Sequence, residues 1–305
     1  MSFDFSKMHG LGNDYVFVDA VHQTLPADLP ELARRVSDRH FGIGSDGLIW
    51  VGPSAKAPVR MRIFNADGSE AQMCGNGLRC AARFAFERRL FEGKTVEPYD
   101  AMRKVLAQLA PQHRGRLAAV TVETGRGVLT VALLISSAGA VERACINLDR
   151  PILEPVKIPV DLPGTDAVAR DLAVLGRTLK MTCVSMGNPH AVIFCDDVNK
   201  IDLDVLGPAI ENHKLFPQRV NVHFVQVLDS ATMRMITWER GSGRTMACGT
   251  GAAAVAVAGV LERRAARAVT IHLPGGSLSL LWNDADECVY QLGPAVEAFR
   301  GVFPS

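Results

Sequence analysis

The sequence lacks a strong charge of either sign. Its 305 residues carry 33 basic and 32 acidic side chains, which leaves a formal net charge of +1. Binding to nucleic acid or to an anionic membrane surface requires a concentrated positive field. The composition therefore predicts no nucleic-acid partner and favours a small molecule as the main partner.

Long apolar runs are also missing. Nothing in the chain approaches the roughly 18 consecutive apolar residues of a membrane-spanning helix. Residues 1–6 show no basic segment followed by an apolar run, the pattern typical of a secretory signal. We therefore expect a cytoplasmic protein without a membrane partner.

Cysteine is sparse and scattered. The seven cysteines are an odd number and include no C-x-x-C pair, which argues against a disulfide framework or a zinc knuckle, so no metal centre is expected. Five of them are interpreted as small buried apolar residues: Cys80, Cys145, Cys183, Cys195 and Cys288. Cys74 and Cys248 differ, because each begins a C-G-x-G motif.

These two motifs belong to an internal repeat. Cys74 and Cys248 stand 174 residues apart, and a Gly-Asn pair recurs 175 residues apart, at Asn13 and at Asn188. At about 150 residues per domain, the length also suggests two domains. Two elements that repeat in the same order and at nearly one spacing indicate duplicated halves.

Each C-G-x-G motif has the same expected setting. A strand-like run, residues 59–64 or 233–238, leads through a polar turn to the cysteine, and a helical pattern with basic residues in its last turn follows over 78–90 or 252–264. Each cysteine should therefore lie at a helix N-terminus. The second helix is apolar nearly all round, which predicts burial at the centre of a domain.

The remaining pattern indicates mixed α/β structure with a domain junction near residues 147–155. Further strands are expected at 14–20, 48–51, 120–124, 128–134, 191–195, 222–228, 269–273 and 278–282, and further helices at 29–37, 97–109 and 203–212. The GIGSDG run at 42–47 matches the dinucleotide fingerprint in form. Because a helical pattern precedes it and a strand follows, we interpret it as a loop and not as a dinucleotide-binding turn.

A thiol at a helix N-terminus is a usable acid or base, because unpaired N–H groups and the helix dipole favour the thiolate and bring its pKa to about 3.5–7.5. Two such thiols facing one cleft could invert a stereocentre by removing a proton on one face and returning one on the other. The backbone N–H groups of Gly75, Asn76, Gly249 and Thr250 could hold a carboxylate. No pyridoxal-phosphate site is recognisable, so no cofactor is expected.

Five motifs in order carry a resemblance over nearly the whole chain: KMHGLGNDYVFVD, RIFNADGSEAQMCGNG, VSMGNPHAV, RVNVHFVQV and ERGSGRTMACGTG. The chain resembles the diaminopimelate epimerases. The resemblance implies a cofactor-independent, two-base isomerase that interconverts L,L- and meso-2,6-diaminoheptanedioate for lysine and peptidoglycan synthesis, with a homodimer as its form. It implies two pseudo-symmetric α/β domains, each a curved mixed sheet wrapped around a central helix, and an active site in the cleft between them.

The same resemblance assigns residues. The expected domains are residues 1–148 with 293–305, carrying Cys74, and residues 149–292, carrying Cys248. The two cysteines would be the acid/base pair, and His190 and Glu239 would tune their pKa values. The expected substrate-binding residues are Asn13, Asn65, Gly75, Asn76, Asn188, Asn221, Glu239, Arg240, Gly249 and Thr250, with Glu239 and Arg240 at the distal amino-acid end of the substrate.

The chain departs from the family pattern in two places. Arg244 stands where a glutamate is common in the family. The segment 91–117 is longer than expected for the family, and we interpret it either as a surface elaboration or as part of a dimer contact. Three other functions are weighed. A non-catalytic binding module of the same fold would have no reason to keep both helix-end thiols. Another two-thiol racemase of the same fold, acting on proline or hydroxyproline, would share C-G-x-G but need not share Glu239-Arg240. A thiol-disulfide redox protein would be expected to carry a C-x-x-C motif or a nearby resolving cysteine.

Overall fold

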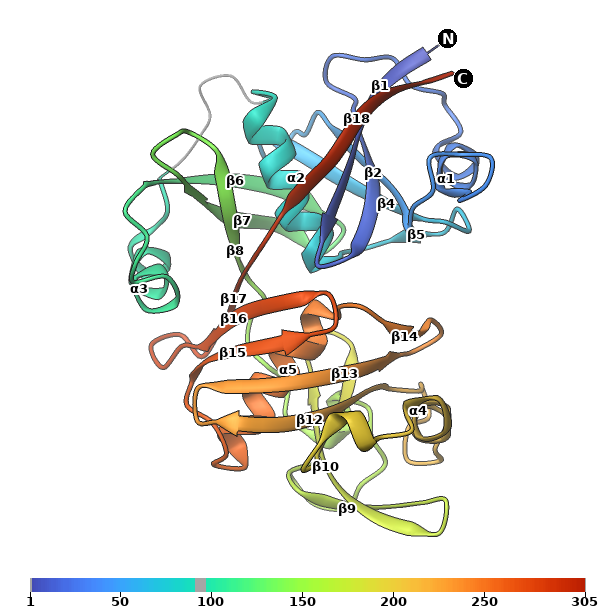
Figure 1. Cartoon of the computed structure of the whole chain (residues 1–305), viewed down its shortest axis with the longest axis vertical. Helices are drawn as coiled ribbons and strands as arrows, with labels where there is room; N and C mark the ends of the chain where they lie inside the picture. Colours follow the sequence, from blue (N-terminus) through green and yellow to red (C-terminus); the bar gives the residue numbers. More distant parts are fainter. Residues whose placement is uncertain (1, 91–96, 305) are drawn as a thin grey trace. The chain divides into compact units, whose positions relative to one another are not determined.

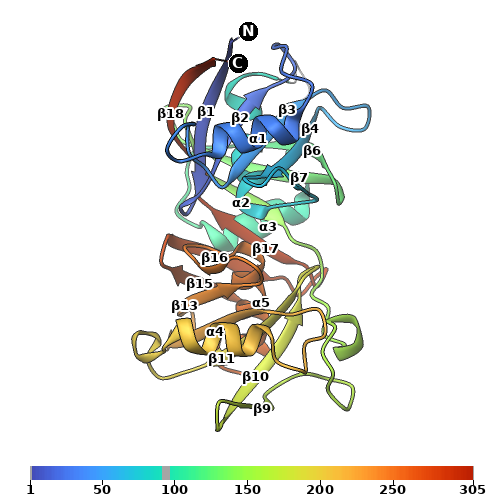
Figure 2. The ribbon, with the colours of Figure 1, turned by 90° about the vertical axis from the view of Figure 1, so that its right-hand side faces the viewer.

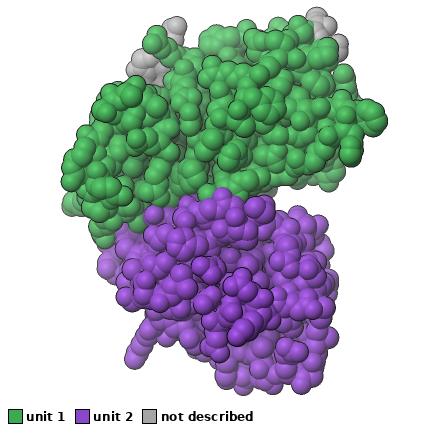
Figure 3. Space-filling model, viewed as in Figure 1, with its two compact units in different colours: residues 1–147, 292–305 green, residues 148–291 purple. Residues whose placement is uncertain are grey.

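The computed structural model describes residues 2–90 and 97–304 (Figure 1). It divides into two compact units, Met1–Asn147 with Leu292–Ser305, and Leu148–Gln291, coloured separately in Figure 3. We call them unit 1 and unit 2. Within the described residues, no helix is both long enough and apolar enough to cross a membrane.

Unit 1 is a mixed sheet wrapped around one helix (Figures 1 and 2). Neighbouring strands pair in the order β18-β1-β2-β3-β4-β6-β7-β8, with parallel pairs at β2–β3 and β4–β6 and antiparallel pairs elsewhere. Helix α2 packs against seven of these strands, β1 to β4 and β6 to β8. The expected curved sheet around a central helix is thus confirmed for this unit. The elements are β1 (Ser2–Gly10), β2 (Asn13–Asp19), α1 (Leu29–Ser37), β3 (Gly47–Gly52), β4 (Val59–Asn65), β5 (Glu70–Ala71), α2 (Gly75–Glu87), α3 (Asp100–Leu109), β6 (Arg116–Thr124), β7 (Gly127–Ile135), β8 (Val141–Asn147) and β18 (Val296–Pro304).

Unit 2 repeats this pairing. Its strands run β9-β10-β11-β12-β13-β15-β16, again with parallel pairs at the corresponding places, β11–β12 and β13–β15. Helix α5 packs against β10, β11, β12, β15 and β16, so it takes the place of α2. The pseudo-symmetry expected from the sequence repeat is confirmed. The elements are η1 (Pro155–Lys157), β9 (Arg170–Val174), β10 (Arg177–Ser185), β11 (Pro189–Phe194), η2 (Val198–Lys200), α4 (Leu203–Glu211), β12 (Asn221–Asp229), β13 (Thr232–Glu239), β14 (Gly243–Thr245), α5 (Gly249–Leu261), β15 (Ala268–Leu273) and β16 (Gly276–Trp282), and β17 (Val289–Gly293) spans the boundary between the units.

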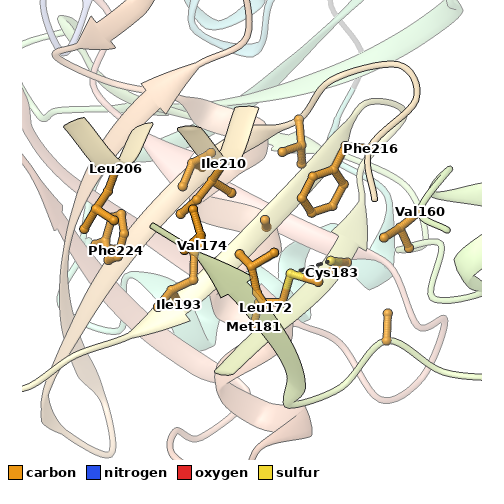
Figure 4. Packing of buried hydrophobic residues seen from close by; sticks show 14 of the residues in the cluster. Val160, Leu172, Val174, Met181, Cys183, Ile193, Leu206, Ile210, Phe216 and Phe224 are labelled. Atoms are coloured by element: carbon orange, nitrogen blue, oxygen red, sulfur yellow. Dashed lines mark hydrogen bonds between the residues drawn. The ribbon is translucent and has the colours of Figure 1, made fainter. Parts of the chain in front are cut away.

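The surface helices α1 and α4 occupy equivalent places, because α1 packs on β3 and β4 and α4 packs on the corresponding strands β12 and β13. Buried residues recur along α1 at the i, i+3, i+4 and i+7 spacing that gives a helix one apolar face: Leu29, Leu32, Ala33 and Val36. In unit 2, Leu206 and Ile210 of α4 pack with Phe224, Ile193 and Val174 in a dense apolar cluster (Figure 4). Both helices were predicted from this periodicity.

Both central helices end earlier than predicted. The arginines expected in their last turns instead follow them, because α2 stops at Glu87 and α5 at Leu261. Arg89 and Arg263 have φ angles of 53° and 56°, in the left-handed region that terminates a helix. These arginines therefore sit beyond the C-terminal turns rather than inside them.

The long segment 91–117 is only partly described, since residues 91–96 lie outside the described residues. The helix expected at 97–109 begins three residues later, as α3. Four of its residues are buried, namely Met102, Val105, Leu106 and Leu109. The described part of the segment is therefore a packed helix followed by the start of β6.

Candidate functional site

Cys74 is the N-cap residue of α2, as predicted. Its backbone is extended, and its Sγ accepts a hydrogen bond from the N–H of Gly77 at 3.4 Å. Gly77 allows Ile49 of β3 to pack closely on this end of the helix, because a Cβ at that position would stand 2.7 Å from Cδ1 of Ile49. The first N–H groups of the helix, including those of Gly75 and Asn76, have no acceptor within the helix and face its N-terminal end.

Asn13 lies against the Cys74 thiol. Its Oδ1 is 3.3 Å from Sγ, and its Nδ2 donates to Oδ2 of Asp46 at 2.8 Å. Since a carboxylate can only accept, Asp46 fixes the orientation of the Asn13 amide and turns Oδ1 toward the thiol. Asp46 belongs to the GIGSDG loop, which joins α1 to β3. The helix-before-strand order rules out a dinucleotide fingerprint, as expected, and the loop supports a site residue.

Asn76 is oriented by a residue that the sequence analysis missed. Nη2 of Arg79 donates to Oδ1 of Asn76 at 2.6 Å, and Asn76 in turn donates to Oδ1 of Asn13 at 3.4 Å. The Arg79 side chain is completely buried within unit 1, and its Nε also donates to the carbonyl of Pro294. The sequence did contain a signal for this role, because Arg79 is a charged residue in a helix made mostly of small and apolar residues. The remaining unit 1 candidate, Asn65, ends β4 and donates to Oγ of Ser69.

Cys248 is likewise the N-cap residue of α5, but its surroundings differ. Its Sγ lies 3.8 Å from Oγ1 of Thr250. Burial, and then the carboxylate of Glu239, hold the pKa of Cys248 well above its usual range, although the N–H of Gly251 opposes this. The expectation of a lowered pKa is therefore wrong for this thiol in this structure, because loss of hydration outweighs the helix N-terminus.

His190 and His223 form a buried pair beside Cys248. Nδ1 of His190 is 2.9 Å from Nε2 of His223, and both side chains are completely buried. A Cβ on Gly251 would stand 2.3 Å from Cε1 of His223 and 3.0 Å from Sγ of Cys248, so ring and thiol flank the same glycine. His190 was predicted to act near a thiol, whereas His223 was not singled out.

Within the described part of the chain, the side chains of His190, His223 and Cys248 could together hold a metal ion. Each offers one ligand atom, and these atoms lie within 4.8 Å of one another. All four imidazole nitrogens already have hydrogen-bond partners. His190 also contacts Oδ1 of Asn188 at 3.1 Å, and His223 also contacts Oγ1 of Thr237 at 3.0 Å. Because a metal would have to break these bonds, the cluster fits a hydrogen-bonded pair better than a metal centre.

Glu239 and Arg240 lie where β13 ends. Glu239 accepts from Oγ1 of Thr245 at 2.5 Å, and the N–H of Arg240 donates to Oδ1 of Asn221 at 3.0 Å. Nδ2 of Asn221 donates to the carbonyl of Pro189. Asn221 thus ties the start of β11 to the turn after β13, and both ends of its amide contact backbone groups. Gly249 accepts from Nε2 of Gln291.

Glu211, the last residue of α4, supports this turn and was missed by the sequence analysis. It is 5% exposed and accepts from Nε1 of Trp238 at 2.7 Å and from the N–H of Gly241 at 2.9 Å. Arg219 pairs with the same carboxylate. A buried carboxylate that accepts backbone and indole N–H groups holds the chain on both sides of Glu239 and Arg240.

We predict that Glu211→Gln destabilises unit 2 by about 1–3 kcal/mol, because the new NH2 group faces N–H donors and leaves one of them unsatisfied. Urea unfolding followed by tryptophan fluorescence measures the change. Glu154→Gln is the control, since its exposed pair with Lys157 contributes little. Equal stability of the two variants would contradict this account.

Arg244 forms an ion pair with a residue of α4. Its Nη2 pairs with Oδ2 of Asp204 on α4 at 2.9 Å, and both side chains are more than half exposed. Exposed ion pairs contribute little to stability. The departure from the family pattern is therefore accommodated by a surface pair.

Comparison with known proteins shows which family this chain matches. The family model of diaminopimelate epimerase matches residues 5–134 and 182–297. A diaminopimelate epimerase of Moorella thermoacetica is 48% identical over 300 residues, which cover 98% of this chain and 99% of that protein. One from Methanothermobacter thermautotrophicus is 44% identical over 303 residues, which cover 98% and 97%.

Solved structures share the fold at low identity. A phenazine biosynthesis protein of the PhzF family from Bacillus anthracis has a TM-score of 0.67 and 16% identity, with 100% of both chains covered. A probable proline racemase from Agrobacterium radiobacter K84 has a TM-score of 0.65 and 14% identity, with 99% and 92% covered. The family model and the close relatives confirm what the five sequence motifs indicated: the chain belongs to the diaminopimelate epimerase family, a family of isomerases.

Proposed function

We propose that this protein interconverts L,L- and meso-2,6-diaminoheptanedioate without a cofactor, with Cys74 and Cys248 as its two acid/base groups. The observation that carries the proposal is a thiol at the N-terminus of the central helix in each of two units with the same sheet order. Family membership supports the substrate. We also propose the domain limits given above, which lie one residue from the observed division of the chain.

The proposed reaction is a proton exchange. A thiolate removes the α-proton on one face of the carbon, and the other cysteine, as a neutral thiol, delivers a proton to the opposite face. The raised pKa of Cys248 supports the neutral thiol as its form before substrate binds. The charge of the deprotonated carbon is spread onto its carboxylate, which the N–H groups of Gly75, Asn76, Gly249 and Thr250 would hold.

Recognition of the rest of the substrate falls to polar side chains. Glu239 and Arg240 would bind the distal ammonium and carboxylate, whose charges they complement. Asn13, Asn65, Asn188 and Asn221 would donate or accept hydrogen bonds. His190 and Glu239 would tune the thiols; the effect of Glu239 on the pKa of Cys248 supports that role for one of them.

The competing racemase function has weaker support. A hydroxyproline epimerase from Agrobacterium vitis has the fold, at 12% identity and a TM-score of 0.60, whereas the diaminopimelate epimerases are 40–48% identical. Assay of the reduced protein with L,L-diaminopimelate, L-proline and trans-4-hydroxy-L-proline separates the two. Turnover of the first alone supports the proposal, and turnover of a proline alone would contradict it.

We further propose a homodimer in the cytoplasm, on the pathway to lysine and peptidoglycan. A mechanism based on thiols requires a reducing compartment, which supports the location. Strand β18, which pairs with β1, exposes Val296, Phe299 and Val302, apolar side chains that a second copy could cover. Light scattering of the purified protein measures the oligomeric state.

A further inference from the structure

His223 stands in the middle of a chain of hydrogen bonds that runs through the buried part of unit 2. Oγ1 of Thr237 on β13 contacts Nδ1 of His223 on β12, and Nε2 of His223 contacts Nδ1 of His190 on β11. Nε2 of His190 then contacts Oδ1 of Asn188, in the turn before β11. Three neighbouring strands thus connect Thr237 to a predicted substrate-binding amide.

Both rings are neutral. Burial lowers the pKa of His223 to about 3. Burial, His223 and the charge of Arg240 hold the pKa of His190 well below its usual range. A neutral imidazole has one N–H and one accepting nitrogen, so a single proton lies between the two rings.

The direction of each hydrogen bond follows from the acceptor at the end of the chain. Oδ1 of Asn188 only accepts, so Nε2 of His190 carries the proton and its Nδ1 accepts. Nε2 of His223 must then donate to that Nδ1, which leaves Nδ1 of His223 to accept from the hydroxyl of Thr237. Both histidines are therefore Nε2–H tautomers, and the hydroxyl, which can donate or accept, completes the chain as a donor.

The other unit shows that the fold does not need a histidine here. Ile49 of β3 corresponds to His223 of β12. Each lies two residues after the first residue of its strand that pairs with the neighbouring parallel strand. Each also packs on the glycine that stands three residues after the N-cap cysteine of its unit. A Cβ on Gly77 would meet Ile49, and one on Gly251 would meet His223. An aliphatic side chain therefore fills this position in unit 1, and the polar ring is particular to unit 2.

We propose that His223 is a positioning residue: by donating from Nε2 to Nδ1 of His190 it supports the Nε2–H tautomer of that ring, whose hydrogen bond to Oδ1 of Asn188 leaves the NH2 group of the amide for the substrate. This inference rests on the proposed function. We infer that the substrate group this amide meets is a carboxylate, to which Asn188 can only donate because a carboxylate only accepts hydrogen bonds. With the opposite tautomer of His190, the Asn188 amide would reverse and present its oxygen to the carboxylate.

His223→Phe tests the proposal, because it keeps an aromatic ring and removes both nitrogens. KM for L,L-diaminopimelate should rise about 10- to 100-fold, the loss expected for a hydrogen bond to a charged group, while kcat stays within about threefold. His223→Gln, which retains an N–H within reach of His190, should recover part of the loss. An unchanged KM, or a fall in kcat alone, would overturn the proposal.

Thr237→Val and Thr237→Ser provide a second, milder test should His223→Phe fail to fold. The valine variant removes the terminal donor and should raise KM, and the serine variant should behave as the wild type. ¹⁵N NMR of histidine-labelled protein reports the tautomers directly and does not depend on activity. We expect Nε2–H for both rings in the wild type. An Nδ1–H tautomer of His190 in the wild type would overturn the positioning role, even if the protein proved inactive on diaminopimelate.

Discussion

Replacing Cys74 or Cys248 by alanine should lower the rate of epimerisation by about 10²- to 10⁴-fold, the contribution of a positioned acid or base. Each variant lacks one of the two groups that inversion requires. Cys145→Ala is the matched control, because that thiol is completely buried in unit 1 and burial raises its pKa to about 12. The control should keep wild-type turnover, and its loss of stability should not exceed the cost of a small cavity.

Hydrogen exchange separates the two variants further. An enzyme with one remaining thiol can remove the α-proton on that face and return a solvent deuteron to the same face, without inversion. In D2O, Cys74→Ala and Cys248→Ala should therefore each exchange one isomer, and not the same one. Exchange of the same isomer by both variants, or near wild-type epimerisation by either, would contradict the assignment of the two thiols to opposite faces.

Unit 2 should lose stability steeply as the pH falls below about 6.5. The pKa values of His190 and His223 are lower in the folded chain than in the unfolded chain, so the unfolded chain binds more protons in this range. Each histidine then contributes a slope on the order of 1 kcal/mol per pH unit, from about pH 6.5 downward. For His223 the stabilisation is lost progressively until the pH reaches its folded pKa of about 3.

Urea unfolding at several pH values measures this slope. A Trp50→Phe background confines the fluorescence signal to Trp238 and Trp282, both in unit 2. His223→Gln should reduce the slope of the unfolding free energy against pH by the contribution of one histidine, on the order of 1 kcal/mol per pH unit. Identical slopes with and without His223 would show that its burial does not disfavour the protonated ring.

Periodicity and repetition in the sequence predicted much of the architecture. The i, i+3, i+4, i+7 pattern located α1, and the repeated C-G-x-G motif placed Cys74 and Cys248 at helix N-termini. These features are local, because a helix face and a capping residue depend on neighbours in sequence. The wrapping of each sheet around its helix was implied by the family resemblance, and the order of the strands was not predicted.

Several strands were missed where the pattern is weak. β1 and β18 pair with each other from opposite ends of the chain, and β18 exposes most of its residues, so neither run shows the uniform apolar character of a buried strand. β10 begins with four polar or half-exposed residues before its buried half. Such strands are specified by distant partners, which local composition does not reveal.

The sequence predicted which thiols would react, and it missed buried side chains that support the predicted site residues. Arg79, Glu211 and His223 act through contacts with residues far away in the sequence, and each is a polar side chain that burial makes significant. The pKa of Cys248 was misjudged for the same reason. The effect of a helix N-terminus can be inferred from the motif, but the loss of hydration depends on the surrounding fold.

The most direct test of the proposed function is incubation of the reduced protein with L,L-diaminopimelate in D2O, followed by NMR of the α-protons. The two-thiol account predicts meso product that carries solvent deuterium at the inverted carbon, because the proton delivered comes from a thiol in exchange with solvent. Meso product that retains the original proton, or no product from folded and reduced protein, would contradict it.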